Sequence, residues 1–245
     1  MKSLFTRVFL RSLLIQSCWN YEGMQNVGFA FGMIPVIEAA GLNKKERAGL
    51  LTNCLTYFNT HPYLASAIIG ATASVQAGRG VEADREIREI KDTLSNPFAA
   101  LGDALFWSTL KPLFSVTALI AALLGSILSP LIFLVLYNTL HLWVRGAGFM
   151  HGVRGRIDLM RYVKRMEIPN LSADLKRITL VLLGIFVAGL SFFLPLPTAA
   201  RGPGWLGVLP VVGVLVVALL VRKGVGLIGQ IYIFSLAVML ICWLL

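Results

Sequence analysis

The sequence predicts an all-α integral membrane protein. Its N-terminal half is expected to consist of amphipathic and broken helices, discontinuous or re-entrant, and its C-terminal half to hold about three transmembrane helices. The composition supports this class, since 57% of the 245 residues are hydrophobic, only 14% are charged, and the mean hydropathy is +0.76. A soluble domain of this size carries more charge and fewer long apolar runs.

Hydropathy and charge divide the chain into four regions. We expect an N-terminal helical region with polar motifs at residues 1–111, a kinked span or re-entrant hairpin at 112–144, a basic cytoplasmic loop at 145–177 and a three-span membrane region at 178–245.

The first helix is predicted to be amphipathic. Leu4, Val8 and Ile15 recur near helical spacing, and Arg7 and Arg11 lie one turn apart. This pattern is typical of a helix that lies in the cytoplasmic interface of a membrane.

Two apolar segments follow, Met24–Leu42 and Leu64–Ala77, and neither is a convincing full span of roughly 20 residues. The first is broken by Gly28, Gly32 and Pro35. Short, interrupted apolar segments indicate discontinuous helices around a substrate site. They equally suit buried helices that pack on a partner subunit, and the two interpretations are compatible.

A capped helix is expected between these segments. Asn43 is a suitable N-cap, and Glu46 stands three residues later, as a capping box requires. The helix is predicted to end near Phe58, and Pro62 then begins the next one, which ends at residues 78–80.

The next segment, Val81–Leu94, alternates acids and bases, with Asp84 and Arg88 at helical neighbour spacing. It predicts a solvated helix with local ion pairs, and Lys91 is counted among its solvated bases. The apolar stretch Leu113–Val144 then contains Gly125 and a Ser-Pro break, which either kink one span or turn a hairpin.

Charge sets the expected topology. Residues 145–177 carry eight basic and three acidic side chains, so by the positive-inside bias this stretch lies in the cytoplasm. The spans Ile178–Leu196, Trp205–Val221 and Val225–Leu245 then leave the C-terminus outside the cytoplasm. Nucleic-acid binding is the rival explanation of the basic stretch, but no recognition motif accompanies it.

Sequence motifs for catalysis are missing. The chain contains no Walker-type phosphate loop, no His-Glu-x-x-His and no Gly-x-Ser-x-Gly. Its three histidines are too scattered along the sequence to suggest a metal site. We therefore expect no catalytic residue, no metal and no cofactor.

Side chains suited to holding a polyol gather in two short stretches of this apolar chain. Buried amides donate and accept hydrogen bonds at once and so match a hydroxyl group, and an aromatic face covers the C–H surface of a sugar ring. The candidate substrate-binding residues are Gln16, Trp19, Asn20, Glu22, Gln25, Asn59, Thr60 and His61. A structural alternative stays open for the second stretch, in which Asn59 and Thr60 cap a helix that Pro62 begins.

Three motifs carry a resemblance to a known family. They are QSCWNYEGMQ at 16–25, YFNTHP at 57–62 and GDALFWSTLKP at 102–112. In this order they resemble the IID subunit of the mannose/fructose/sorbose family of the bacterial phosphotransferase system, over the N-terminal two-thirds of the chain.

The resemblance implies a division of labour between subunits. A IID subunit pairs with a IIC subunit in the inner (cytoplasmic) membrane to form a conduit for a hexose-type sugar, as part of a higher hetero-oligomer among membrane lipid. A cytoplasmic IIB subunit, phosphorylated on its own histidine by IIA, phosphorylates the emerging sugar. The chain itself is then non-catalytic.

Two other classes of function remain. A membrane scaffold or receptor subunit without transport of its own does not need the polar cluster. A secondary transporter needs ion-coupling carboxylates within its spans, yet residues 178–245 contain no acid.

Overall fold

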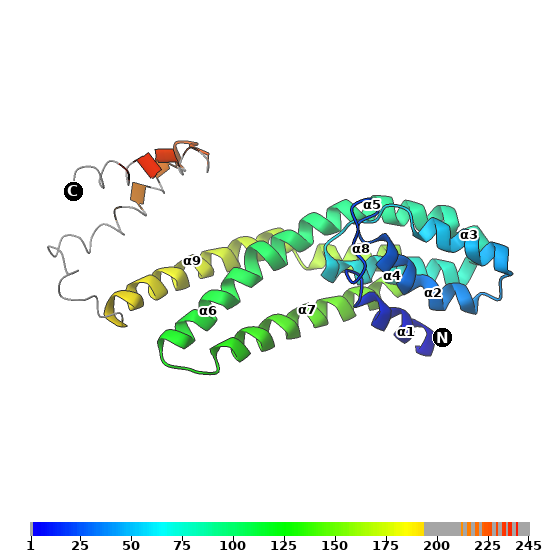
Figure 1. The fold of residues 1–245 in the computed structure, drawn as a ribbon, viewed down its shortest axis with the longest axis horizontal. Coiled ribbons are helices and arrows are strands. Elements are labelled where there is room, and N and C mark those ends of the chain that lie inside the picture. The colour runs from blue at the N-terminus through cyan, green and yellow to red at the C-terminus, as the bar shows by residue number, and fades with distance from the viewer. Residues whose placement is uncertain are drawn as a thin grey trace. The chain divides into compact units, whose positions relative to one another are not determined.

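The computed structural model describes residues 2–193 and, beyond them, only scattered positions between 212 and 239. Residues Met1–Ser191 form one compact unit and Phe192–Leu245 a second, and the first is described here. Its helices are α1 (Lys2–Ser12), α2 (Asn26–Ala39), α3 (Lys44–Cys54), α4 (Pro62–Arg79), α5 (Asp84–Gly102), α6 (Lys111–Leu123), α7 (Ser129–Arg154), α8 (Arg156–Arg165) and α9 (Ile168–Phe193) (Figure 1).

The centre of this unit is the packing of α4 against α7, which depends on small residues. A Cβ atom added to Gly152 would lie 2.2 Å from the carbonyl oxygen of Ala67, and one at Gly70 would lie 2.6 Å from that of Phe149. Glycine at these positions lets the two backbones approach closely, as small residues do between membrane helices. The core of the unit therefore lies along α4.

The two short apolar segments predicted from the sequence correspond to α2 and α4. Most residues of both helices are buried, including Phe29 and Met33 of α2 and Leu64 and Ile68 of α4. Their cover comes from other helices of this chain, among them α1, α3, α5 and α7. The chain itself therefore covers most of both helices.

Helix α3 has the predicted capping box. The side chain of Asn43 accepts a hydrogen bond from the backbone N–H of Glu46 at 3.0 Å, and the Glu46 carboxylate accepts one from the N–H of Asn43 at 3.0 Å. The helix ends at Cys54, four residues earlier than expected. Helix α4 begins at Pro62 as predicted, and Gly80 with φ of +57° follows its last residue.

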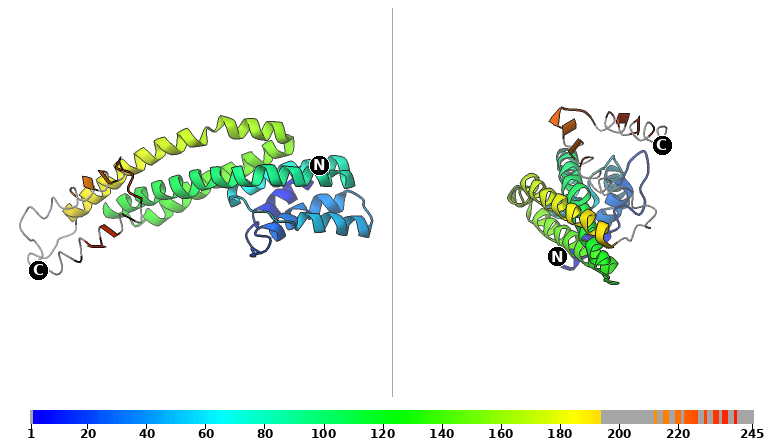
Figure 2. Two further views of the ribbon diagram at one scale, coloured as in Figure 1. Left: turned by 90° about the horizontal axis from the view of Figure 1, so that it is seen from above. Right: turned by 90° about the vertical axis from the view of Figure 1, so that its left-hand side faces the viewer.

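Helices α5 and α6 are joined by a π-helical segment, Asp103–Leu110, into one helical run from Asp84 to Leu123. The chain then turns through Gly125, with φ of +85°, and returns along α7. Figures 1 and 2 show this hairpin extending away from α1–α4. Residues 113–144 fold as a helix–turn–helix hairpin of α6 and α7, and the expected boundary at residues 111 and 112 falls inside a continuous helical run.

The hairpin supplies the helices suited to a bilayer. Asp84–Leu123 and Ser129–Arg154 are each long and apolar enough to cross a membrane, and apolar side chains such as Leu119, Leu131 and Leu134 are about half exposed on them. An exposed apolar surface on a long helix is expected where lipid or another membrane subunit covers it.

The basic stretch at 145–177 is helical. It comprises the end of α7, all of α8 and the start of α9. His151 of α7 and Asp158 of α8 form a 2.6 Å contact, and the ring of Tyr162 stacks on that of His151 at 4.3 Å. The expected span Ile178–Leu196 begins within α9, whereas Trp205–Val221 and Val225–Leu245 lie outside the continuously described residues.

Candidate substrate-path site

The first polar motif forms a tight loop before α2. The side-chain oxygen of Asn20 accepts a hydrogen bond from the N–H of Gly23 at 2.8 Å, and its amide donates to the side chain of Asn26 at 2.9 Å. Backbone hydrogen bonds also join Asn20 to Met24, which has φ of +57°. The loop leaves Trp19 and Glu22 on the surface.

Gln25 connects the first motif to the second. Its amide nitrogen donates to the carbonyl oxygen of Thr60 at 2.8 Å, and its amide oxygen accepts from the Thr60 N–H at 3.2 Å. Gln25 and Thr60 are each 3% exposed. A backbone hydrogen bond from Gln25 to Phe58 at 2.9 Å adds to this pairing, so the loop at 19–25 and the segment at 58–60 are held as one unit.

His61 connects the second motif to the third. Its Nδ1 accepts a hydrogen bond from the backbone N–H of Tyr63 at 3.3 Å and caps α4. Its ring stacks on Phe106 at 5.1 Å and meets Trp107 edge-on at 4.9 Å, both from the π-helical segment. A Cβ atom on Gly102 would lie 2.2 Å from the Cβ of His61, so only glycine fits there. Segments of π-helix often occur at functional sites.

The imidazole of His61 is buried, and this fixes its charge state. Burial and, to a smaller extent, the nearby positive charge of Arg145 together lower the pKa of His61 to about 4. The ring is therefore neutral near pH 7. Its Nε2 atom and the hydroxyl of Thr60 are both buried without a hydrogen-bond partner among the described residues. Buried polar atoms are normally paired, so these two are available to a ligand or to water.

Two buried cations stabilise the site, and neither was among the predicted site residues. The ammonium of Lys91, on α5, donates to the carbonyl oxygens of Cys54 and Thr56 at 3.3 and 3.2 Å and to the Thr56 hydroxyl at 2.8 Å. Lys91 is 2% exposed and lies 4.6 Å from the ring centre of Phe29. Its assignment to a solvated face was wrong, whereas the predicted pair of Asp84 and Arg88 is present at 2.6 Å.

Arg145 is the second cation. Its guanidinium donates to the carbonyl oxygens of Pro62 at 3.1 Å and Leu13 at 3.3 Å, and it lies 5.1 Å from the ring centre of Tyr63. The residue is 7% exposed. Arg145 is therefore not a solvated loop residue, because it ties α7 to the turn that begins α4 and to Leu13, which lies between α1 and the first motif.

The eight predicted site residues divide by exposure. Gln16, Trp19 and Glu22 are exposed, Asn20 and Asn59 are half-buried, and Gln25, Thr60 and His61 are buried. The structure pairs Gln25 with Thr60 directly, and Asn20 with its own loop. The cap of α4 is His61 and not the predicted Asn59 or Thr60. The buried members thus hold the motifs together, while His61 Nε2, the Thr60 hydroxyl and the exposed members remain available to a ligand.

Exposed aromatic side chains accompany these polar groups. Trp19 is 45% exposed and packs edge-on against Tyr21 at 5.0 Å, and Trp107, which contacts His61, is 50% exposed. Aromatic faces beside amides and a carboxylate are the combination that binds a sugar. Trp107 lies in the third motif, directly before Ser108 and Thr109, and was not among the predicted site residues.

Among the described residues the fold is helical, two helices are long and apolar enough to span a bilayer, and three polar motifs converge beside them, as suits a helical membrane protein. A family model described as EIID-AGA, PTS system mannose/fructose/sorbose family IID component, matches residues 1–195. The chain belongs to this family.

Curated relatives agree with the assignment. The chain is 36% identical over 186 residues to the PTS system mannose-specific EIID component of Escherichia coli (strain K12), covering 74% of this chain and 64% of that relative. It is 31% identical over 183 residues to the PTS system sorbose-specific EIID component of Klebsiella pneumoniae, covering 74% and 67%. It is 32% identical over 196 residues to the fructose permease IID component of Bacillus subtilis (strain 168), covering 77% and 67%. The chain thus spans about two-thirds of the length of these relatives.

Solved structures share the fold. A chain from a cryo-electron microscopy structure of the mannose transporter ManYZ in complex with microcin E492 matches 99% of this chain and 95% of its own length, with a TM-score of 0.60 and 28% identity. A chain described as a membrane protein matches 76% of this chain and 70% of its own length, with a TM-score of 0.67 and 33% identity.

Proposed function

We propose that this chain is the sugar-translocating membrane subunit of a phosphoenolpyruvate-dependent phosphotransferase system. It forms the path for a hexose-type sugar together with a IIC subunit, in a higher hetero-oligomer of the cytoplasmic membrane. A IIB subunit, charged by IIA, phosphorylates the sugar, and this chain contributes no catalytic residue.

One observation supports this proposal most strongly, the convergence of the three motifs on His61. Gln25 brings in the first motif through Thr60, and the third motif lies against the imidazole through Gly102 and Phe106. These motifs are far apart in sequence, yet they meet around the buried amide of Gln25, whose nitrogen and oxygen both form hydrogen bonds. Such an arrangement indicates a site whose geometry is fixed by its surroundings. The exposed side chains of the first motif, Trp19 and Glu22, supply the aromatic face and the carboxylate for substrate.

The partner is proposed from the exposed apolar surface of the hairpin, together with the ManYZ likeness. A sugar must cross the membrane in a polar path, and polar groups that face hydrocarbon cost several kcal/mol each. The polar cluster of this chain therefore faces a second subunit or a path shared with it.

A co-expression experiment tests the proposal. Cells that lack their own sugar phosphotransferase systems are given IIA, IIB and IIC together with this chain, and phosphoenolpyruvate-dependent uptake of labelled hexose is measured. We expect uptake only when this chain and IIC are both present, and we expect the two to co-purify. Uptake by IIC without this chain, or sugar binding by a stable monomer of this chain, would contradict the proposal. Asn59→Ala, which alters a half-buried side chain of the site, is expected to reduce uptake with co-purification intact.

A further inference from the structure

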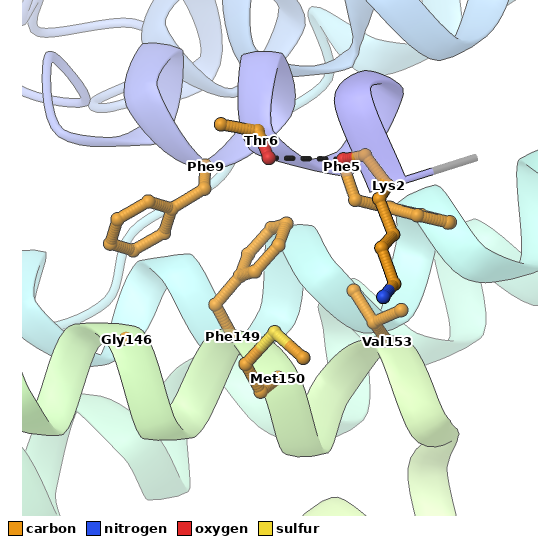
Figure 3. A pocket seen from close by; sticks show the side chains of 8 residues that line it. All are labelled: Lys2, Phe5, Thr6, Phe9, Gly146, Phe149, Met150 and Val153. Atoms are coloured by element: carbon orange, nitrogen blue, oxygen red, sulfur yellow. Dashed lines mark hydrogen bonds between the residues drawn. The ribbon is translucent and has the colours of Figure 1, made fainter.

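A groove between α1 and α7 lies outside the candidate substrate-path site. Its volume is about 600 Å³, within the range of roughly 300–1,000 Å³ that is typical of small-molecule sites. Eight residues line it, four from each helix: Lys2, Phe5, Thr6 and Phe9 of α1, and Gly146, Phe149, Met150 and Val153 of α7 (Figure 3).

The walls of this groove are apolar. The rings of Phe9 and Phe149 pack against each other, with their centroids 5.3 Å apart, and so form one continuous apolar wall. The hydroxyl of Thr6 donates to the carbonyl oxygen of Lys2 at 3.0 Å, so it offers the groove no free donor. Gly146 leaves space, because a Cβ atom added there would meet no atom within 4 Å. An elongated hydrocarbon chain suits such a surface.

One charge lines the groove, the amine of Lys2, whose side chain extends toward α7 in Figure 3. Among the described residues no carboxylate forms an ion pair with it, whereas the neighbouring Arg7 is 3.8 Å from Glu38. A free cation beside an apolar groove is complementary to an anionic head group attached to an apolar tail. Basic pockets between membrane helices bind anionic lipid head groups in this way.

The surroundings of the groove match the edge of a bilayer. Trp143 and Met150, on α7 at helical spacing from Gly146, are 59% and 52% exposed. Tryptophan is enriched at membrane interfaces, and α1 is an amphipathic helix of the kind that lies there. The groove therefore opens where phospholipid is available.

We propose that the α1–α7 groove binds one anionic phospholipid, with an acyl chain lying along the apolar wall that Phe9 and Phe149 form together and the phosphate at the Lys2 amine. Bound lipid then joins α1 to α7 and orders the helix that precedes the first polar motif.

Lipid retention by the full-length chain tests this proposal. The protein is purified from membranes together with its membrane partner in mild detergent, stripped of lipid, and titrated with phosphatidylglycerol or with phosphatidylcholine of the same acyl chains, and bound lipid is quantified by mass spectrometry. We expect saturable binding of phosphatidylglycerol in preference to phosphatidylcholine. Gly146→Leu fills the groove and should reduce the retained phosphatidylglycerol roughly tenfold, while the control Gly49→Leu, also at a glycine with open space around it, should retain as much as the unaltered chain.

The charge is tested separately, with a variant that leaves the packing unchanged. Lys2→Gln should lower the preference for phosphatidylglycerol over phosphatidylcholine about fivefold, the effect of one basic residue near an anionic surface. Equal retention by the two leucine variants would overturn the proposal, as would equal binding of both head groups by the unaltered chain. A Met150→Cys variant that cross-links efficiently to another polypeptide would also overturn it, because a protein would then occupy the groove.

Discussion

Replacing Gln25 by methionine tests whether the first two motifs form one structural unit. Methionine keeps the length of the side chain and removes both hydrogen bonds to Thr60, at 2.8 and 3.2 Å. Both residues are 3% exposed, so water cannot replace the lost partner. An unpaired buried backbone group costs about 1–3 kcal/mol. With two such groups on Thr60, the expected loss in the free energy of unfolding is roughly 2–5 kcal/mol.

Thermal unfolding of the purified complex measures this loss. At about 2–4 °C per kcal/mol for a chain of this size, the apparent Tm should fall by roughly 5–15 °C. Gln16→Met is the matched control, because it makes the same chemical change at an exposed residue of the same motif. It should change stability by no more than about 0.5 kcal/mol. Equal Tm values for the two variants would refute the reasoning.

Three further predictions concern the buried surroundings of the site. Lys91→Glu should destabilise the folded chain by about 3–5 kcal/mol and so abolish assembly, because it places a carboxylate against the carbonyls that the ammonium now binds. The same change at exposed Lys45 should leave co-purification intact. Gly102→Ala should destabilise by about 1–3 kcal/mol through its contact with His61, measured as Tm, whereas Gly49→Ala in an open helical position should be neutral or slightly stabilising. Since the folded pKa of His61 is about 4 and an unfolded histidine titrates near 6.5, the unfolded state binds the proton more readily. Stability should therefore be full above pH 6.5 and fall by about 1.4 kcal/mol per pH unit toward pH 4, and His61→Gln should show a weaker fall in Tm over that range.

Local signals in the sequence predicted much of the fold because they act over a few residues. The capping box of Asn43 and Glu46 and the start of α4 at Pro62 are present as expected. The breakers at Gly125 and Ser129 correctly marked a change of direction, but the choice between a kink and a hairpin needs contacts between α6 and α7. Such contacts join residues far apart in sequence, and a local pattern does not contain them.

The two buried cations show why the rest of the site was missed. Lys91 lies four residues after Ile87 and three before Leu94, both buried, so it stands on the apolar face of α5. Arg145 shares a face of α7 with Gly148 and Gly152, which pack against α4. Helical spacing therefore indicates that both side chains lie on buried helix faces. Composition alone does not indicate this, because both residues lie in segments rich in charge.

Sugar binding by the purified complex tests the central claim most directly, with Glu22 as the residue altered. This carboxylate is exposed in the same loop as Trp19, so Glu22→Gln is expected to leave assembly and Tm unchanged. The affinity for hexose, measured by titration calorimetry on the complex with IIC, should fall on the order of ten- to a hundredfold, as expected for about 1–3 kcal/mol of lost hydrogen bonding. If the Kd for every hexose bound by the unaltered complex is the same in the variant, the first motif does not form part of the sugar path.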